Sequence, residues 1–263
     1  MPRATHPCAR TWNRQCLPFV LAALGIVPVA LAAETSAAKK SLQQTLLPLI
    51  AAHQGEVGLA VKHLKSGESY EYQADRPMPT ASLIKLPVMI AAYDAVQNGK
   101  LSLDDMIELK KEDQVPGSGI LTPHFSPGTR LSFRDAIRLM IVYSDNTATN
   151  LVLDKLGLPA TNEYTADRGC PETRINAKVF RRDTSIAKER SQEFGLGSTT
   201  AREMIGLCEA LHAKKLVSET AAAQMLDHLF ACDDKLKVPR MLPAGTPAYS
   251  ASASRSSRCS GSG

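Results

Sequence analysis

Apolar residues follow two different spacings between residues 35 and 75. Leu42, Leu46 and Leu49 recur at helical spacing and Gly55 follows, so a helix is predicted over residues 35–54. In residues 57–64 the apolar residues instead alternate with smaller or polar ones, which is typical of a strand. Lys65-Ser66-Gly67-Glu68 then predicts a turn, with a returning strand at residues 70–73. The pattern predicts a helix followed by a β-hairpin.

The next stretch, residues 79–93, is almost wholly apolar and predicts a buried helix that ends at Gly99. Ser82 and Lys85 stand near its start, three residues apart, so they share one helix face. Burial lowers the pKa of a lysine, and a neutral lysine can take the proton of a serine hydroxyl. Pro87 lacks a backbone donor and is expected to bend or loosen the first turns.

Helical spacing resumes in the second half of the chain. Helices are predicted over residues 132–142, 147–156, 200–213 and 218–231. Ser132 with Asp135, and Thr200 with Glu203, have the spacing of capping boxes. Residues 104–114 are polar and irregular, residues 116–119 predict a flexible loop, and the charged residues 169–197 lack a period. Strands at the front and helices behind them favour an α+β domain.

Composition adds an export signal to this picture. The full chain of 263 residues is 44% hydrophobic and 22% charged, an ordinary globular balance. Residues 1–32 start basic, continue with an apolar run and end in Ala30-Leu31-Ala32, as a cleavable signal peptide does. Its removal takes away three arginines and lowers the net charge from +5 to +2, so no nucleic-acid partner is indicated. We expect an exported protein, periplasmic or secreted, with no membrane association after signal cleavage.

The cysteines and histidines do not indicate a metal site. Cys170, Cys208, Cys232 and Cys259 follow the signal at spacings that match no zinc pattern, and their disulfide pairing stays open. No His-x-His or His-Glu-x-x-His pair occurs. No metal or other cofactor is expected.

Two short motifs carry the candidate chemistry. Ser-x-x-Lys occurs three times, at residues 36–39, 82–85 and 185–188, but a buried helix follows only the second. An isolated match is more often a capping serine beside a solvated lysine. Ser144-Asp145-Asn146 occurs once, on the turn between two predicted helices. Asp145 or Asn146 could simply cap the second of these helices.

Together these motifs, in this order, resemble the class A β-lactamase and penicillin-binding family of serine hydrolases. The resemblance spans about residues 40 to 247 and implies an antiparallel sheet flanked by helices plus an all-helical subdomain. It implies that Ser82 attacks a β-lactam or acyl-D-Ala-D-Ala carbonyl with Lys85 as a candidate base. Ser144 would relay a proton to the leaving nitrogen, Asn146 would bind substrate and Lys85, and Asp145 would be structural.

The chain departs from the family pattern in two ways. A late Lys-Thr/Ser-Gly strand is absent, and Lys65-Ser66-Gly67 lies upstream of Ser82 in the predicted turn. Residues 248–263 contain no aliphatic residue larger than alanine and predict a disordered tail, so we expect a domain over residues 33–247 whose C-terminal strands are missing. The deacylating glutamate also has no match in the family's spacing. Glu189 and Glu193 are the candidates, and either could be a solvated surface charge.

The leading expectation is a monomeric serine β-lactamase that opens the β-lactam ring through an acyl-enzyme on Ser82, impaired by the missing strand. Its partner would be a small-molecule β-lactam or a peptidoglycan-like peptide. Two alternatives stay open: a D-Ala-D-Ala peptidase or penicillin-binding protein, and a non-catalytic truncated remnant.

Overall fold

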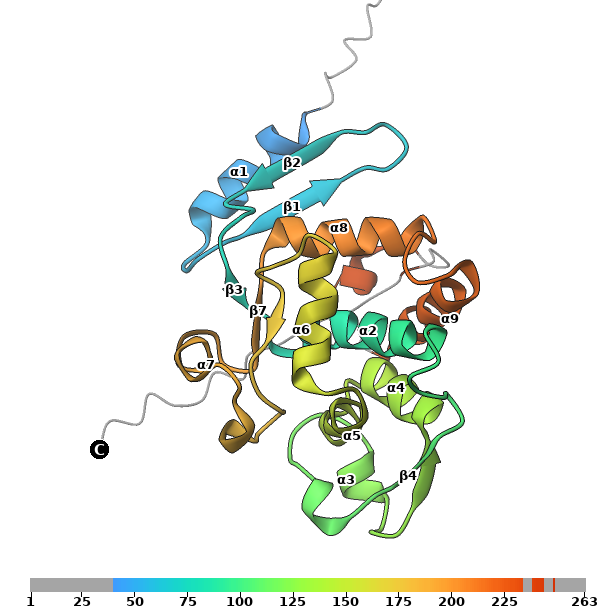
Figure 1. Cartoon of the computed structure of the whole chain (residues 1–263). Coiled ribbons are helices and arrows are strands. Elements are labelled where there is room, and N and C mark those ends of the chain that lie inside the picture. Colours follow the sequence, from blue (N-terminus) through green and yellow to red (C-terminus); the bar gives the residue numbers. More distant parts are fainter. Residues whose placement is uncertain (1–39, 234–237, 244–247, 249–263) are drawn as a thin grey trace, which may run out of the picture. The chain divides into compact units, whose positions relative to one another are not determined.

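A helix that is apolar on nearly every side, α2 (Lys85–Gln97), lies at the centre of the fold. The computed structural model in Figure 1 describes residues 40–233, 238–243 and 248, all within the unit Lys40–Gly263. Ten of the thirteen residues of α2 are buried, Lys85 among them. A helix without a polar face must be covered on all sides. Helices α4 (Phe133–Val142), α5 (Asn146–Leu156), α6 (Leu158–Asp167) and α9 (Glu219–Phe230) pack around it.

The predicted helices of the second half are confirmed, and local caps set their starts. The Ser132 hydroxyl accepts from the Asp135 amide at the start of α4, and Thr200 accepts from the Glu203 amide at the start of α8 (Ala201–His212). Neither pair forms a full capping box: the Asp135 carboxylate accepts from the Ser132 hydroxyl and not from its backbone amide. The Glu203 carboxylate accepts from the Glu172 amide and the Thr173 hydroxyl, so its tertiary partners displace the local bond. Helix α6 was not predicted.

The predicted front of the chain also forms. Strands β1 (Leu59–Lys62) and β2 (Ser69–Tyr72) pair as an antiparallel hairpin, and Leu59 lies opposite Tyr72. Helix α1 (Leu42–Ala52) packs on β2, and α8 packs on β1. Helix α1 begins at residue 42, later than predicted, because Ser41 caps it with a full capping box.

Two further sheets are built from strands that the sequence pattern did not predict. Strands β3 (Met78–Pro79), β7 (Gly197–Thr199) and β6 (Arg174–Ile175) form an antiparallel sheet in the order β3-β7-β6. Strand β4 (Met106–Glu108) lies within residues 104–114, which were predicted to be irregular, and it pairs with β5 (Arg130–Ser132), which leads directly into α4. These strands have only two or three residues, too few for alternation to stand out. The α+β class is confirmed, and the strands of the described residues are divided among three small antiparallel sheets.

Short helices connect these elements. They are η1 (Ala81–Ile84), η2 (Lys111–Asp113), α3 (Leu121–His124), η3 (Arg182–Thr184), α7 (Lys188–Phe194) and η4 (Val238–Met241). Arg190 links α7 to β7, because its guanidinium donates to Ser198 Oγ at 2.7 Å; it also donates to the Glu172 carboxylate at 2.9 Å.

Several predictions fall on parts of the chain without a structural description. The signal peptide and the serine-rich tail beyond residue 248 lie outside the described residues. After α9, the described residues contain one 3₁₀ turn and no strand. Within the described part of the chain, no helix is long and apolar enough to cross a membrane, and Cys170, Cys208 and Cys232 are free thiols.

Candidate active site

Ser82 lies in η1 and Lys85 is the first residue of α2, so the pair stands where a 3₁₀ turn becomes an α-helix. The predicted contact is present, since Lys85 Nζ lies 3.2 Å from Ser82 Oγ. The first turn is tighter than the predicted α-helix. Pro87 falls in the first turn of α2, where backbone donors have no α-helical partner, so it removes no such bond.

The Lys85 ammonium is enclosed by oxygen atoms of the Ser144-Asp145-Asn146 turn between α4 and α5. Nζ lies 3.0 Å from Ser144 Oγ, 2.7 Å from the Ser144 carbonyl and 3.0 Å from Asn146 Oδ1. Only 3% of Lys85 is exposed. Burial lowers its pKa to about 8, against an opposing effect of the Asp145 carboxylate. Lys85 therefore touches both hydroxyls of the site and can lose its proton near neutral pH.

Asp145 is a structural residue, as its capping position predicted. One carboxylate oxygen accepts from the Ala148 amide at 2.8 Å and caps α5. The other accepts from the Ile120 and Leu121 amides at 2.6 and 2.8 Å. The charge is thus held by three backbone donors, which fixes the turn beneath Lys85 and joins it to the preceding loop.

Residues 116–119, predicted to be a flexible loop, are packed against this turn. Ser118 Oγ donates to the Ser144 carbonyl at 2.7 Å, and Asn146 Nδ2 donates to the Pro116 carbonyl at 3.0 Å. A Cβ on Gly119 would lie 2.3 Å from an Asp145 carboxylate oxygen, so only glycine fits there. The glycines of this loop are visible in the sequence, but their packing partner is not, because no local rule says what a loop packs against.

Glu189 and Glu193 are not brought into this cluster. Both lie exposed on α7, and their carboxylates make no hydrogen bond or ion pair among the described residues. Asp145 is the one carboxylate of the described chain that acts on the pKa of Lys85, and its oxygens already accept three hydrogen bonds. Ser82, Lys85, Ser144 and Asn146 do come together, and the described residues contain no cluster of ligands for a metal ion.

Comparison with known proteins agrees with this arrangement. Residues 39–258 match the model of the beta-lactamase enzyme family. The chain belongs to this family.

Relatives and solved structures point the same way. Beta-lactamase PSE-4 of Pseudomonas aeruginosa is 26% identical over 162 residues, which are 61% of this chain and 55% of that protein. Beta-lactamase AER-1 of Aeromonas hydrophila is 32% identical over 123 residues, 46% of this chain and 40% of that protein. The chain therefore spans about half the length of the curated relatives it matches.

Among solved structures, the beta-lactamase of Sphaerobacter thermophilus superposes with a TM-score of 0.67 at 31% identity, over 76% of this chain and 73% of that one. PBP-A also superposes with a TM-score of 0.67 at 25% identity, over 77% and 73% of the two chains. These likenesses confirm the predicted family and the β-lactamase-type α+β fold.

Proposed function

We propose that this member of the beta-lactamase family opens β-lactam rings through an acyl-enzyme on Ser82. The observation that supports it best is the position of Lys85 Nζ, 3.2 Å from Ser82 Oγ and 3.0 Å from Ser144 Oγ. A neutral amine between two hydroxyls can accept the proton of one and return it through the other.

The proposed acylation moves one proton around this cluster. Lys85 takes the proton of Ser82 while Ser82 Oγ forms a bond to the β-lactam carbonyl carbon. The ring C–N bond then breaks, and the leaving nitrogen takes the proton of Ser144 Oγ. Lys85 restores the Ser144 proton, so the amine ends neutral beside a Ser82 ester. Asn146, whose side chain holds Lys85 at 3.0 Å, positions the base and binds the substrate.

Hydrolysis of the ester needs a base for the attacking water, and this step separates two candidate functions. With turnover the protein is a β-lactamase. A long-lived ester instead makes it a penicillin-binding protein, and one observation favours this second candidate. Among the described residues no carboxylate hydrogen-bonds to Ser82, Lys85 or Ser144. Asp145 is held by three backbone donors, and Glu189 and Glu193 lie exposed on α7.

Labelled penicillin and a chromogenic cephalosporin distinguish these outcomes on the purified full chain. We expect mass spectrometry to find one penicilloyl group on Ser82, and Ser82→Ala to lose it while its thermal melting stays unchanged. Labelling with cephalosporin turnover identifies a β-lactamase, and labelling without turnover a penicillin-binding protein. A folded protein that takes no label would be the non-catalytic remnant, and both proposals would be wrong.

The proposed localisation is the periplasm or the medium. Expression of the full chain followed by cell fractionation tests it, and an uncleaved protein retained in the cytoplasm would contradict it.

A further inference from the structure

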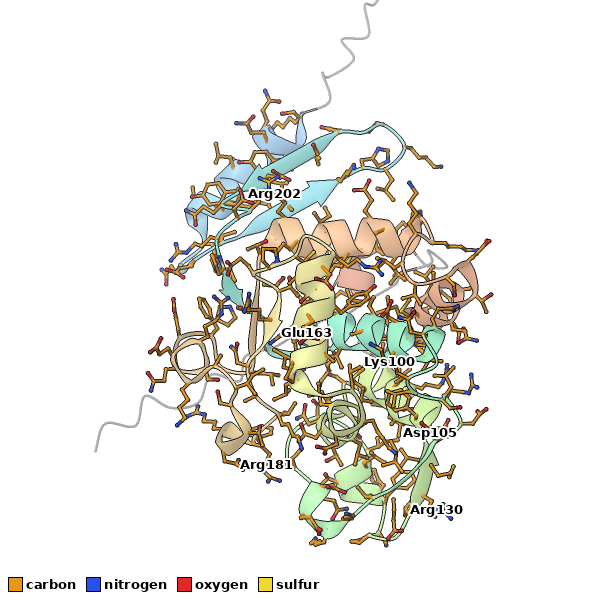
Figure 2. The ribbon with its side chains drawn as sticks, viewed as in Figure 1. Lys100, Asp105, Arg130, Glu163, Arg181 and Arg202 are labelled. Carbon is orange, nitrogen blue, oxygen red and sulfur yellow. The ribbon has the colours of Figure 1, made fainter. Side chains whose placement is uncertain are left out.

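A rigid turn at residues 178–181 lies against the candidate active site. Arg181 N donates to the Lys178 carbonyl at 3.2 Å and closes the turn. Val179 is fixed by the buried amide of Asn150, which accepts from Val179 N at 2.8 Å and donates to its carbonyl at 3.0 Å. Lys178 also forms an ion pair with Asp154 of α5. Figure 2 labels Arg181, the last residue of this turn, below α7 in this view.

Phe180, at the third position of this turn, is placed at a cost to stability. Its φ is +57°, a left-handed conformation that glycine or asparagine adopts far more readily than an aromatic residue. The residue is 63% exposed, so the ring gains little from burial. Strained residues of this kind persist where the surroundings enforce them, and they cluster at functional sites.

The ring of Phe180 and the amide of Asn146 lie against the same glycine. A Cβ on Gly117 would stand 3.2 Å from Phe180 Cε2 and 2.6 Å from Asn146 Nδ2. Through its Oδ1, Asn146 contacts Lys85, which in turn contacts Ser82. The exposed ring of Phe180 therefore lies beside Asn146, the residue proposed to bind substrate, and Asn146 in turn contacts Lys85.

We propose that Phe180 is a specificity-determining residue whose ring forms an apolar wall for the acyl side chain of the substrate. The favoured ligands are β-lactams or acyl peptides with an aromatic or large apolar acyl group. Such a group would cover the exposed ring and stack against it, which removes apolar surface from water. This inference rests on the proposed acylation of Ser82, and it adds a preference that the polar cluster alone cannot produce.

Two penicillins that differ only in the acyl group test this wall. Benzylpenicillin carries a phenylacetyl group, whereas 6-aminopenicillanic acid carries none. We expect Phe180→Ala to lower the second-order rate of Ser82 acylation by benzylpenicillin about tenfold, the scale of discrimination by an apolar pocket, and that by 6-aminopenicillanic acid less than about twofold. Phe180→Tyr keeps the ring and should restore the benzylpenicillin rate.

Leu49→Ala is the matched control, because Leu49 is similarly exposed at 65% but lies on α1. We expect it to leave both rates unchanged. Equal losses with the two penicillins in Phe180→Ala would mean that the residue holds the shape of the site, and no loss with either would mean that the ring is unused. Both results overturn the inference. If neither compound acylates the folded wild type, the proposed function itself fails, and this inference with it.

Discussion

The pKa of Lys85 predicts how acylation depends on pH. Burial brings the pKa to about 8 from the ordinary value of 10.5. At pH 7 about one lysine in ten is then neutral, compared with about one in three thousand for an unperturbed lysine. If Lys85 is the base, the acylation rate should rise about tenfold per pH unit up to pH 8 and level off above it. An unperturbed lysine would give a rise that continues beyond pH 9.

Single-turnover acylation by labelled penicillin, followed by mass spectrometry from pH 6 to 9.5, measures this profile. Lys85→Arg keeps a positive charge but cannot deprotonate, so its rate should fall by about 10² to 10⁴, the usual contribution of a general base. Thermal melting of the variant checks that it folds. A flat wild-type profile, or a Lys85→Arg variant that acylates at the wild-type rate, would refute Lys85 as the base.

The other predictions concern stability. His228 is buried, and this burial, aided by the Arg138 guanidinium, lowers the pKa of His228 from 6.5 to about 4. Between pH 4 and pH 6.5 the unfolded chain therefore binds a proton at His228 that the folded protein does not. Urea titrations should therefore show the free energy of unfolding falling by at most about 3 kcal/mol from pH 6.5 to pH 4. The fall should be smaller in His228→Gln. An equal fall in the wild type and in His228→Gln would contradict this prediction. Gly119→Ala should lower stability by about 2 kcal/mol or more, because its Cβ would overlap Asp145 at a φ of +121°. Gly206 lies on helix α8, and a Cβ added there would have no neighbour within 4 Å, so Gly206→Ala should raise stability by about 1 kcal/mol. Calorimetry measures both variants, and equal changes in stability for Gly119→Ala and Gly206→Ala would contradict these two predictions.

Sequence alone determined the features that depend on neighbours three or four residues away. The Ser82–Lys85 contact follows from their spacing, and the starts of α4 and α8 follow from Ser132 and Thr200 as caps. The hairpin β1-β2 follows from alternation and a local turn. These bonds form within one or two turns of chain, so the residue order specifies them.

Only the tertiary structure decided which distant segments meet. Lys85 and Asn146 are 61 residues apart, and the packing of α2 on α5 brings them to 3.0 Å. The loop at residues 116–119 appeared flexible in sequence because its partner, the Ser144-Asp145-Asn146 turn, lies 25 or more residues away. Glu189 and Glu193 were candidates for the deacylating glutamate because of their position in the chain, but both lie exposed on α7. The lowered pKa of Lys85 has the same origin, because desolvation arises only when the surrounding helices close around its side chain.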